Sequence, residues 1–211
     1  MQDNTRSTTR SHRGIPGDHR PQRGWRIVDI VTAATIAVAF GVVFWGWSFL
    51  WAAVGPAFAA FPPAQGFMYG VWLMPGVLGA LIIRKPGAAI FVELVAATIE
   101  ALLGSHWGLN VVIYGLLQGL AVELAFAAGR YRSFGAVRAL VAGALAGATA
   151  ATLDRLVYYP AWNGTWFATY AALVTLSAAV IAGLGAYLLF RRLADTGVLA
   201  PFASGRRARE V

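Results

Sequence analysis

The sequence of 211 residues contains no cysteine, few charged residues and only three histidines. The absence of cysteine excludes disulfide bonds and thiolate metal sites, and it leaves the redox compartment undetermined. His12 and His19 lie near the N-terminus, and neither HExxH nor another metal-ligand spacing is present. A GxSxG nucleophile elbow and a glycine-rich phosphate loop are also missing. The sequence therefore predicts no metal centre and no ATPase, and no cofactor is expected.

Charged residues make up 12% of the chain, against about 25% in ordinary soluble domains. Hydrophobic residues make up 58%, and the mean hydropathy is +0.63. Because roughly 20 apolar residues cross a bilayer as a helix, this composition predicts an all-α integral membrane protein. We expect six transmembrane helices in one bundle, at Ile27–Val54, Gly66–Ile83, Ala88–Leu103, Val111–Gly129, Ala139–Leu156 and Phe167–Phe190.

The connections between these spans carry turn signals. The segment "GPAFAAFPPAQG" after the first span predicts an irregular outer loop, and Pro75 predicts a kink in the second span. The motif "RKPG" predicts a tight turn before the third span. Gly143 and Gly147 in the fifth span have the small-xxx-small spacing that is typical of close helix packing.

The basic residues predict an orientation. Of the 17 lysines and arginines, 16 fall in the two terminal segments or in the connections on one face, and only Arg155 falls on the other face. The positive-inside rule then places both termini in the cytoplasm, in agreement with an even number of spans. We expect residues 1–24 and 200–211 to be basic cytoplasmic tails, the first of them disordered, and residues 25–199 to form the membrane domain. Since the net charge of +8 is spread over helix ends and tails, it argues against a nucleic-acid partner. The N-terminal tail is expected to be solvated and to help orient the protein, and contact with anionic lipid headgroups is the alternative.

Aromatic residues are concentrated in the opposite, outer half of the spans. Seven of the eight tryptophans and three tyrosines are expected there: Trp45, Trp47, Trp51, Trp72, Trp107, Trp162, Trp166, Tyr69, Tyr158 and Tyr159. Each one alone is explained by an interfacial aromatic belt. As a cluster above buried carboxylates, they favour a site for a flat cation, through stacking and cation–π attraction.

Polar side chains are expected inside the third and fourth spans. The third and fourth spans contain three glutamates, Glu93, Glu100 and Glu123, together with Gln118. At about 100° per residue, Glu93 and Glu100 fall within about 20° of each other on one helix face. We expect them to form an outward-facing site with Gln118 and Tyr114.

Further residues are expected around this site. His106 and Asn110 are expected at its mouth, and Trp72 and Tyr69 among its aromatic walls. Glu123 lies deeper on another face of its helix, and either joins the site or holds helices together. Hydrogen bonding between helices is also the competing explanation for each of the other polar groups. Three glutamates without an intramembrane lysine or arginine favour a ligand that supplies the positive charge itself.

The run "YGVWLMPGVLGALIIRKPGAAIFVELVAATIEALLG", followed by "GLLQGLAVELAFA" and "RY", resembles the hydroxymethylpyrimidine/thiamine permease family. Members of that family are S components, the substrate-binding membrane subunits of energy-coupling factor (ECF) vitamin transporters. The resemblance is clear from Tyr69 to Tyr131 and weaker through "LADTGVL", Leu193 to Leu199.

The resemblance implies a six-helix subunit of a prokaryotic plasma membrane that captures thiamine or hydroxymethylpyrimidine from outside. It would dock on a T transmembrane subunit that carries a pair of ATPases. In such S components, an alanine-xxx-alanine pattern on the first helix faces the T subunit, and Ala33 and Ala37 have that spacing. Packing inside the bundle is the other explanation for these two alanines.

Two other functions remain open from sequence alone. Intramembrane carboxylates also serve proton relays, so a proton-coupled secondary transporter of a small cationic or heteroaromatic solute is the first alternative. The absence of visible inverted repeats weakens it. A membrane enzyme is the second alternative, and the missing nucleophile–base set disfavours it.

Overall fold

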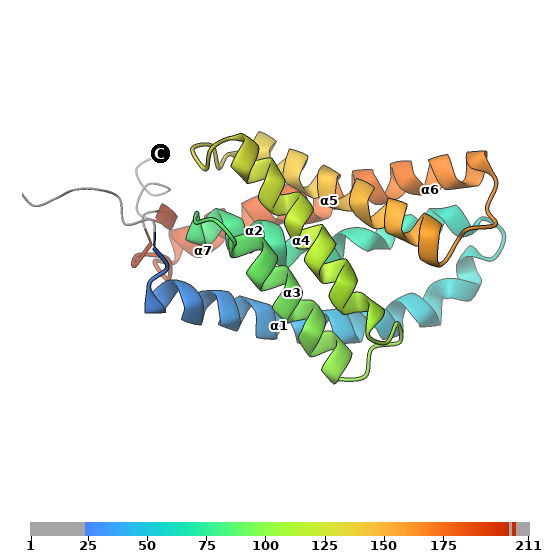
Figure 1. Ribbon diagram of the computed structural model, residues 1–211, viewed down its shortest axis with the longest axis horizontal. Helices are drawn as coiled ribbons and strands as arrows, with labels where there is room; N and C mark the ends of the chain where they lie inside the picture. The colour runs from blue at the N-terminus through green and yellow to red at the C-terminus, as the bar shows by residue number, and fades with distance from the viewer. Residues whose placement is uncertain (1–23, 203, 206–211) are drawn as a thin grey trace, which may run out of the picture.

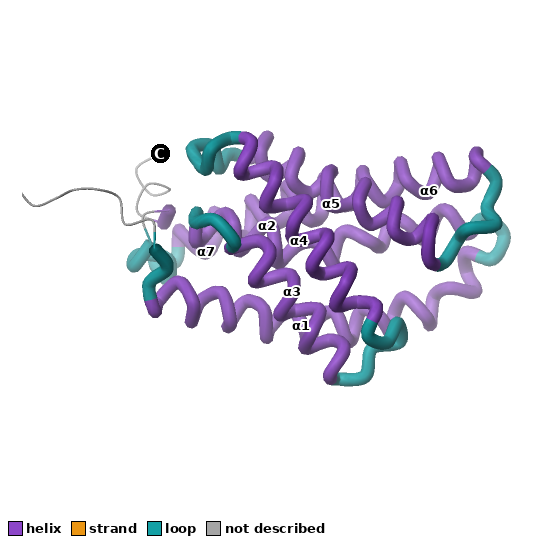
Figure 2. Tube along the Cα trace, viewed as in Figure 1, coloured by secondary structure: helices purple, strands orange, loops and turns teal. Residues whose placement is uncertain are grey.

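The computed structural model describes residues 24–202 and 204–205, and within this part all regular secondary structure is helical (Figures 1 and 2). The expected N-terminal tail, apart from Gly24, and residues 203 and 206–211 of the expected C-terminal tail lie outside the described residues. The elements are α1 (Ile27–Val54), η1 (Gly55–Phe58), η2 (Pro62–Leu73), α2 (Met74–Ile83), α3 (Ala88–Leu102), α4 (Asn110–Ala128), α5 (Ala136–Val157), α6 (Gly164–Ser177), η3 (Ala178–Gly185) and α7 (Ala186–Asp195).

Five helical segments of the described chain are long and apolar enough to cross a membrane. They are Ile27–Phe58, Pro62–Ile83, Asn110–Ala128, Ala136–Val157 and Gly164–Asp195. The remaining expected span, α3, has 15 residues. A helix of that length covers about 22 Å, which is less than the ~30 Å hydrocarbon core. Figure 1 shows α3 crossing α1 obliquely beside α4, and one face of α3, from Ala88 to Glu100, is buried.

The second span begins earlier than the sequence predicted. The expected irregular loop contains two 3₁₀ helices, η1 and η2, so that prediction was wrong. The chain changes from the 3₁₀ helix η2 to the α-helix α2 at Met74, and Pro75 occupies the second position of α2. Proline fits a helix start because its missing N–H has no helical partner there, so Pro75 marks a change of helix type inside the span.

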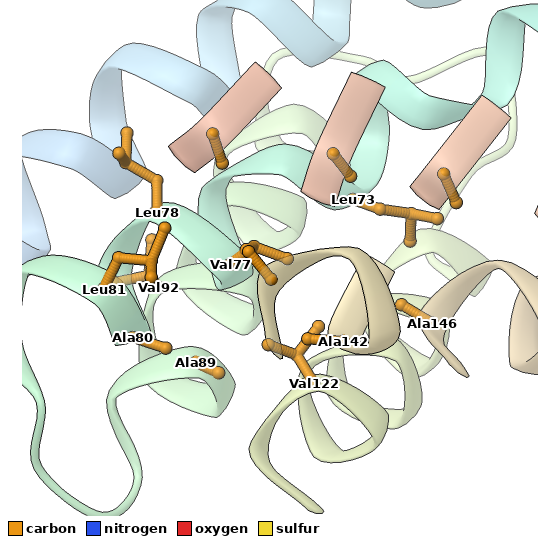
Figure 3. Packing of buried hydrophobic residues seen from close by; sticks show 14 of the residues in the cluster. Leu73, Val77, Leu78, Ala80, Leu81, Ala89, Val92, Val122, Ala142 and Ala146 are labelled. Carbon is orange, nitrogen blue, oxygen red and sulfur yellow. The ribbon is translucent and has the colours of Figure 1, made fainter. Parts of the chain in front are cut away.

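The helix α2 is the centre of the bundle. Every residue from Pro75 to Ile83 is buried, because the surrounding helices cover all sides of α2. Figure 3 shows Val77, Leu78 and Leu81 packed toward Val92 of α3 and Val122 of α4. A helix that is apolar and buried on all sides cannot rotate without opening the core, so it is a fixed support for the helices packed around it.

Small residues bring α5 against the last span. A Cβ atom on Gly143 would lie 2.4 Å from the carbonyl oxygen of Ala178, and one on Gly147 would lie 2.6 Å from the Cβ of Ala178. These distances confirm the close packing that the small-xxx-small spacing predicted. The contact falls at η3, a π-helical segment that joins α6 to α7 in one continuous span.

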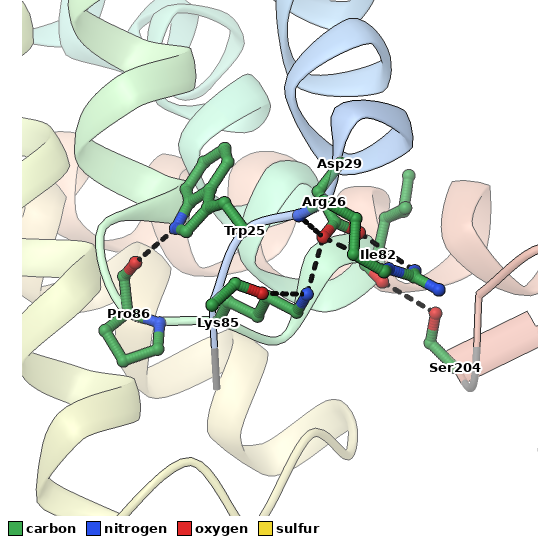
Figure 4. A network of polar contacts seen from close by, with 8 residues as sticks. Trp25, Arg26, Asp29, Ile82, Lys85, Pro86 and Ser204 are labelled. Carbon is green, nitrogen blue, oxygen red and sulfur yellow. Dashed lines mark hydrogen bonds and ion pairs between the residues drawn. The ribbon is translucent and has the colours of Figure 1, made fainter. Parts of the chain in front are cut away.

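The two ends of the described chain lie at the same end of the bundle (Figure 1). There, Asp29 at the start of α1 accepts hydrogen bonds from the backbone N–H of Arg26 and from the Lys85 ammonium, at 2.7 and 2.5 Å (Figure 4). Beyond α7, Phe202 is buried and the Ser204 hydroxyl donates to the Ile82 carbonyl at 2.7 Å. The beginning of the segment 200–211 therefore packs on the bundle.

Ala33 and Ala37 face the interior of the bundle. Both have 0% exposure, on the same side of α1 as Gly41 and Phe44. The close approach of α1 and α3 at this face is visible at Gly41, where a Cβ would lie 2.6 Å from the Cβ of Ile99. The burial of both alanines fits internal packing, the second explanation offered by the sequence, and docking on a T subunit stays a prediction.

Candidate functional site

A pocket of about 550 Å³ lies among η2 and helices α1, α3, α4, α5 and α6. Its lining residues are mostly aromatic or acidic: Phe44, Trp51, Tyr69, Trp72, Glu93, Ala97, Glu100, Trp107, Val111, Tyr114, Gly115, Gln118, Asp154, Tyr158, Tyr159 and Tyr170.

The aromatic walls form one connected cluster. The ring of Trp51 lies 5.3 Å from that of Trp72 and 6.3 Å from that of Trp107, measured between centroids. Trp107 in turn lies 5.1 Å from Tyr158. Burial raises the pKa of Tyr159, in the connection between α5 and α6, to about 12, so this phenol stays neutral at physiological pH. Such walls present π faces, which attract flat and positively charged groups.

Glu93, on α3, has two carboxylate oxygens in different situations. Oε2 accepts a hydrogen bond of 2.7 Å from the backbone N–H of Gly76, in the first turn of α2. That N–H is free because the first N–H groups of an α-helix have no partner inside the helix. Oε1 is buried without any hydrogen-bond partner, although the side chain lines the pocket and is only 1% exposed. Since a buried polar atom without a partner costs about 1–3 kcal/mol, this oxygen points to a missing donor.

Glu100 lies two turns further along α3 and is held by two hydroxyl groups. Ser48 of α1 and Ser105 of the α3–α4 connection both donate to its Oε1, at 2.5 and 3.0 Å. Gly104 has φ +89°, a left-handed conformation that lets the chain turn back over the end of α3. The Ser105 hydroxyl also accepts from the N–H of Trp107 at 3.2 Å. Through these hydrogen bonds, Glu100 links α1 to the α3–α4 connection that carries Trp107.

Asp154, near the end of α5, is a third buried carboxylate in the pocket and was missed by the sequence reasoning. It accepts hydrogen bonds from the hydroxyls of Tyr170, Tyr114 and Tyr69, at 2.6, 2.9 and 3.5 Å. The sequence interpretation named only the three glutamates among the acidic residues of the spans and did not consider Asp154. The available signal was its place inside the apolar stretch Ala139–Leu156, within a chain so poor in acids.

The structure brings six of the nine expected substrate-binding residues to the pocket: Tyr69, Trp72, Glu93, Glu100, Tyr114 and Gln118. His106 and Asn110 are exposed and do not line it. Glu123 lies elsewhere, and its two oxygens accept from the N–H groups of Gly87 and Ala89 at 2.7 and 3.0 Å. It also accepts from the Tyr131 hydroxyl at 2.6 Å. Glu123 thus caps the start of α3 and does not belong to the pocket.

The electrostatics of the pocket are one-sided. Its lining contains three carboxyl side chains and no lysine or arginine. The ion pairs found between described residues both involve Asp29, at the other end of α1. Arg155 is next to Asp154 in sequence, but its guanidinium donates to the carbonyls of Tyr159 and Trp162, at 2.7 and 2.6 Å. The pocket is therefore built for a positively charged or hydrogen-bond-donating ligand.

Comparison with known proteins agrees with this geometry. Residues 28–149 match the family model described as an ABC-type cobalt transport system, permease component. The chain is 31% identical over 191 residues to YkoE of Bacillus subtilis (strain 168), which bears the name HMP/thiamine permease protein. That alignment covers 89% of this chain and 94% of YkoE.

A solved structure is similar over the same extent. It is the crystal structure of an S component of an ECF transporter, with a TM-score of 0.84, 31% sequence identity, and coverage of 89% of this chain and 94% of that one. The chain belongs to the hydroxymethylpyrimidine/thiamine permease family of ECF transporter S components.

Proposed function

We propose that this S component captures thiamine or its hydroxymethylpyrimidine precursor in the acidic aromatic pocket. One observation carries the proposal: Oε1 of Glu93 is buried, unpartnered and part of a pocket whose lining residues supply no cation. A 4-aminopyrimidine presents an amino group beside a ring nitrogen, and the amino N–H can donate to this oxygen. The thiazolium cation of thiamine would be held by aromatic faces and by the other carboxylates.

The composition of the pocket favours an organic cation over a metal ion. The description of the matching family model names cobalt. A metal site needs several oxygen, nitrogen or sulfur ligands converging on one point. Among the described residues no group of three or more His, Asp or Glu side chains could hold a metal ion. The aromatic walls, in contrast, match the flat heteroaromatic compounds in the name of YkoE.

The pocket would open to the outside of the cell. The bundle end that carries the α2–α3 and α4–α5 connections and both ends of the described chain (Figure 1) would be cytoplasmic by the positive-inside rule. Lys85 and Arg132 lie in these two connections. Release of the ligand inward would require a T transmembrane subunit and a pair of ATPase subunits, since this sequence has no phosphate loop. The protein would then work in the plasma membrane of a prokaryote.

Ligand binding to purified protein tests the proposal. Trp51, Trp72 and Trp107 line the pocket, so an aromatic ligand should quench tryptophan fluorescence. Thiamine or hydroxymethylpyrimidine should quench it saturably, and riboflavin, which carries neither an aminopyrimidine nor a cation, should not. Absence of saturable binding by both candidate ligands would overturn the proposal.

Transport by this chain alone is the second measurement. Vesicles that contain only this subunit should not accumulate thiamine when an ion gradient is applied. Accumulation driven by the gradient would instead support the proton-coupled secondary transporter.

A further inference from the structure

Asp154 holds three tyrosines that come from three different elements. Tyr69 belongs to η2, Tyr114 to α4 and Tyr170 to α6, whereas Asp154 itself lies on α5. An ionised carboxylate only accepts, so all three phenols donate to it. Since all four side chains line the pocket, this network shapes the wall of the site directly.

The network fixes how the walls face a ligand. A phenol ring has two main torsions, so a hydrogen bond at its far end leaves it little freedom. With the hydroxyls of Tyr114 and Tyr170 turned toward Asp154, the ring faces remain as the surfaces available to a ligand. Donation to a carboxylate also polarises the phenol toward greater negative charge on the ring, which strengthens its attraction for cations.

Asp154 also brings negative charge that no protein cation neutralises. It is 2% exposed, and no ion pair that the structure shows in residues 24–202 and 204–205 reaches it. Because a charge in a site that excludes water is weakly screened, it acts on a ligand beyond direct contact. Thiamine carries a permanent positive charge and hydroxymethylpyrimidine does not, so this field distinguishes the two.

We infer that Asp154 is a positioning and specificity residue: it fixes the rings of Tyr69, Tyr114 and Tyr170 as the pocket wall and favours permanently cationic ligands over neutral ones. The second half of this inference rests on the proposed function, because it assumes that the pocket binds these compounds. The first half concerns the apo protein alone and stands independently.

The variant Asp154→Asn tests both halves, because the amide keeps the size of the side chain and removes its charge. Tyrosines that donate to a carboxylate absorb to the red of those that do not. The tyrosine bands in the second-derivative absorption spectrum of apo Asp154→Asn should therefore shift to the blue. In binding, the affinity for thiamine should fall about tenfold or more, and that for hydroxymethylpyrimidine by less than about threefold.

Asp29→Asn is the matched control, since Asp29 is also a buried aspartate but binds Arg26 and Lys85 at the other end of α1. It should leave the tyrosine bands and the ratio of the two affinities unchanged. An unshifted spectrum in Asp154→Asn, or parallel losses for both ligands, would overturn the inference. If the wild-type protein binds neither ligand, the proposed function fails and the spectrum alone decides whether Asp154 positions the tyrosines.

Discussion

At the scale of single residues, the proposed function gives Glu93 a structural role and a ligand-binding role in one carboxylate. Its Oε2 occupies the start of α2, where Gly76 leaves an N–H group free, and its Oε1 remains for a ligand. The close approach depends on glycine, because a Cβ at position 76 would lie 2.7 Å from Oε2. A site built in this way has its acceptor fixed before the ligand arrives, which lowers the entropy cost of binding.

The variant Glu93→Gln separates the two roles. The amide oxygen can still accept from Gly76, but the amide NH₂ then replaces the acceptor that faces the ligand. We expect a folded protein with thiamine affinity reduced about ten- to hundredfold, the equivalent of a lost charge-assisted contact of roughly 1.5–3 kcal/mol. Fluorescence titration checks the affinity and thermal unfolding checks the fold. Wild-type affinity in this variant would return Glu93 to a purely structural role.

Glu123→Gln should show the opposite pattern. The carboxylate of Glu123 accepts from two backbone N–H groups and from Tyr131, and an amide can accept on only one of its two atoms. We expect a loss of stability of about 1–3 kcal/mol, seen as a lower unfolding temperature, with ligand affinity unchanged. A weakened affinity at unchanged stability would mean that Glu123 acts on the site.

The residues that sequence could and could not predict differ in where their partners lie. Glu93 and Glu100 share a helix, so helical periodicity alone placed them on one face, and the pocket contains both. Of the three tyrosines around Asp154, Tyr69 lies furthest away in sequence, at 85 positions. Only the tertiary fold brings such groups together, so periodicity could not identify Asp154 as part of the site.

At the scale of elements, α3 carries two of the three carboxyl side chains of the pocket, and α4, which packs against it, carries Gln118. The two helices approach closely through Gly115 and Gly119 of α4, where a Cβ would lie 2.5 Å from the Cβ of Ala97 and 2.9 Å from the Cα of Ile90. Glycine at these positions allows the backbones to come together, as at other small-residue helix contacts in membranes. The contact sets the position of Glu93 relative to Gln118.

Gly119→Ala should therefore affect both stability and binding. The added Cβ would also lie 3.0 Å from the Cβ of Glu93, so α3 must shift or Glu93 must move. We expect a destabilisation of roughly 1–3 kcal/mol, typical of overpacking, together with weaker thiamine binding. Gly46→Ala on the exposed side of α1 is the control, since nothing lies within 4 Å of its Cβ position. Equal behaviour of the two variants would contradict the packing argument.

The span that sequence predicted least well is the second. Prolines and glycines in "GPAFAAFPPAQG" indicated a loop because they disfavour α-helix. In the structure the end of this segment begins η2, a 3₁₀ helix of 12 residues, which is long for this type of helix. Gly66 and Gly70 are required there, because a Cβ on them would lie 3.0 Å from Val174 and 2.6 Å from Ile181. Packing against the last span, which no local pattern reveals, decides the conformation.

At the scale of the whole molecule, the two ends of the bundle differ in chemistry. One end holds the pocket with Trp51, Trp72 and Trp107, and the single basic residue Arg155. The other end holds the Asp29 network, in which Lys85 joins the α2–α3 turn to the start of α1, and Trp25 donates to the Pro86 carbonyl at 3.0 Å (Figure 4). This network ties the start of the described chain to a turn 61 residues away.

The difference between the two ends of the bundle predicts the orientation of the protein in the membrane. The sequence contains no cysteine, so a single introduced cysteine can be labelled specifically to test this orientation. Gly164, at the start of α6, lies at the pocket end, is exposed and has nothing within 4 Å of its Cβ position. Ser133, in the α4–α5 connection, is exposed at the opposite end. In intact cells, a membrane-impermeant maleimide should label Gly164→Cys and leave Ser133→Cys unlabelled until the membrane is opened. On the side that should be cytoplasmic, the terminal segments and the connections carry 16 of the 17 basic residues. Reversal of the labelling pattern would therefore contradict both the positive-inside argument and a pocket that captures its ligand from outside.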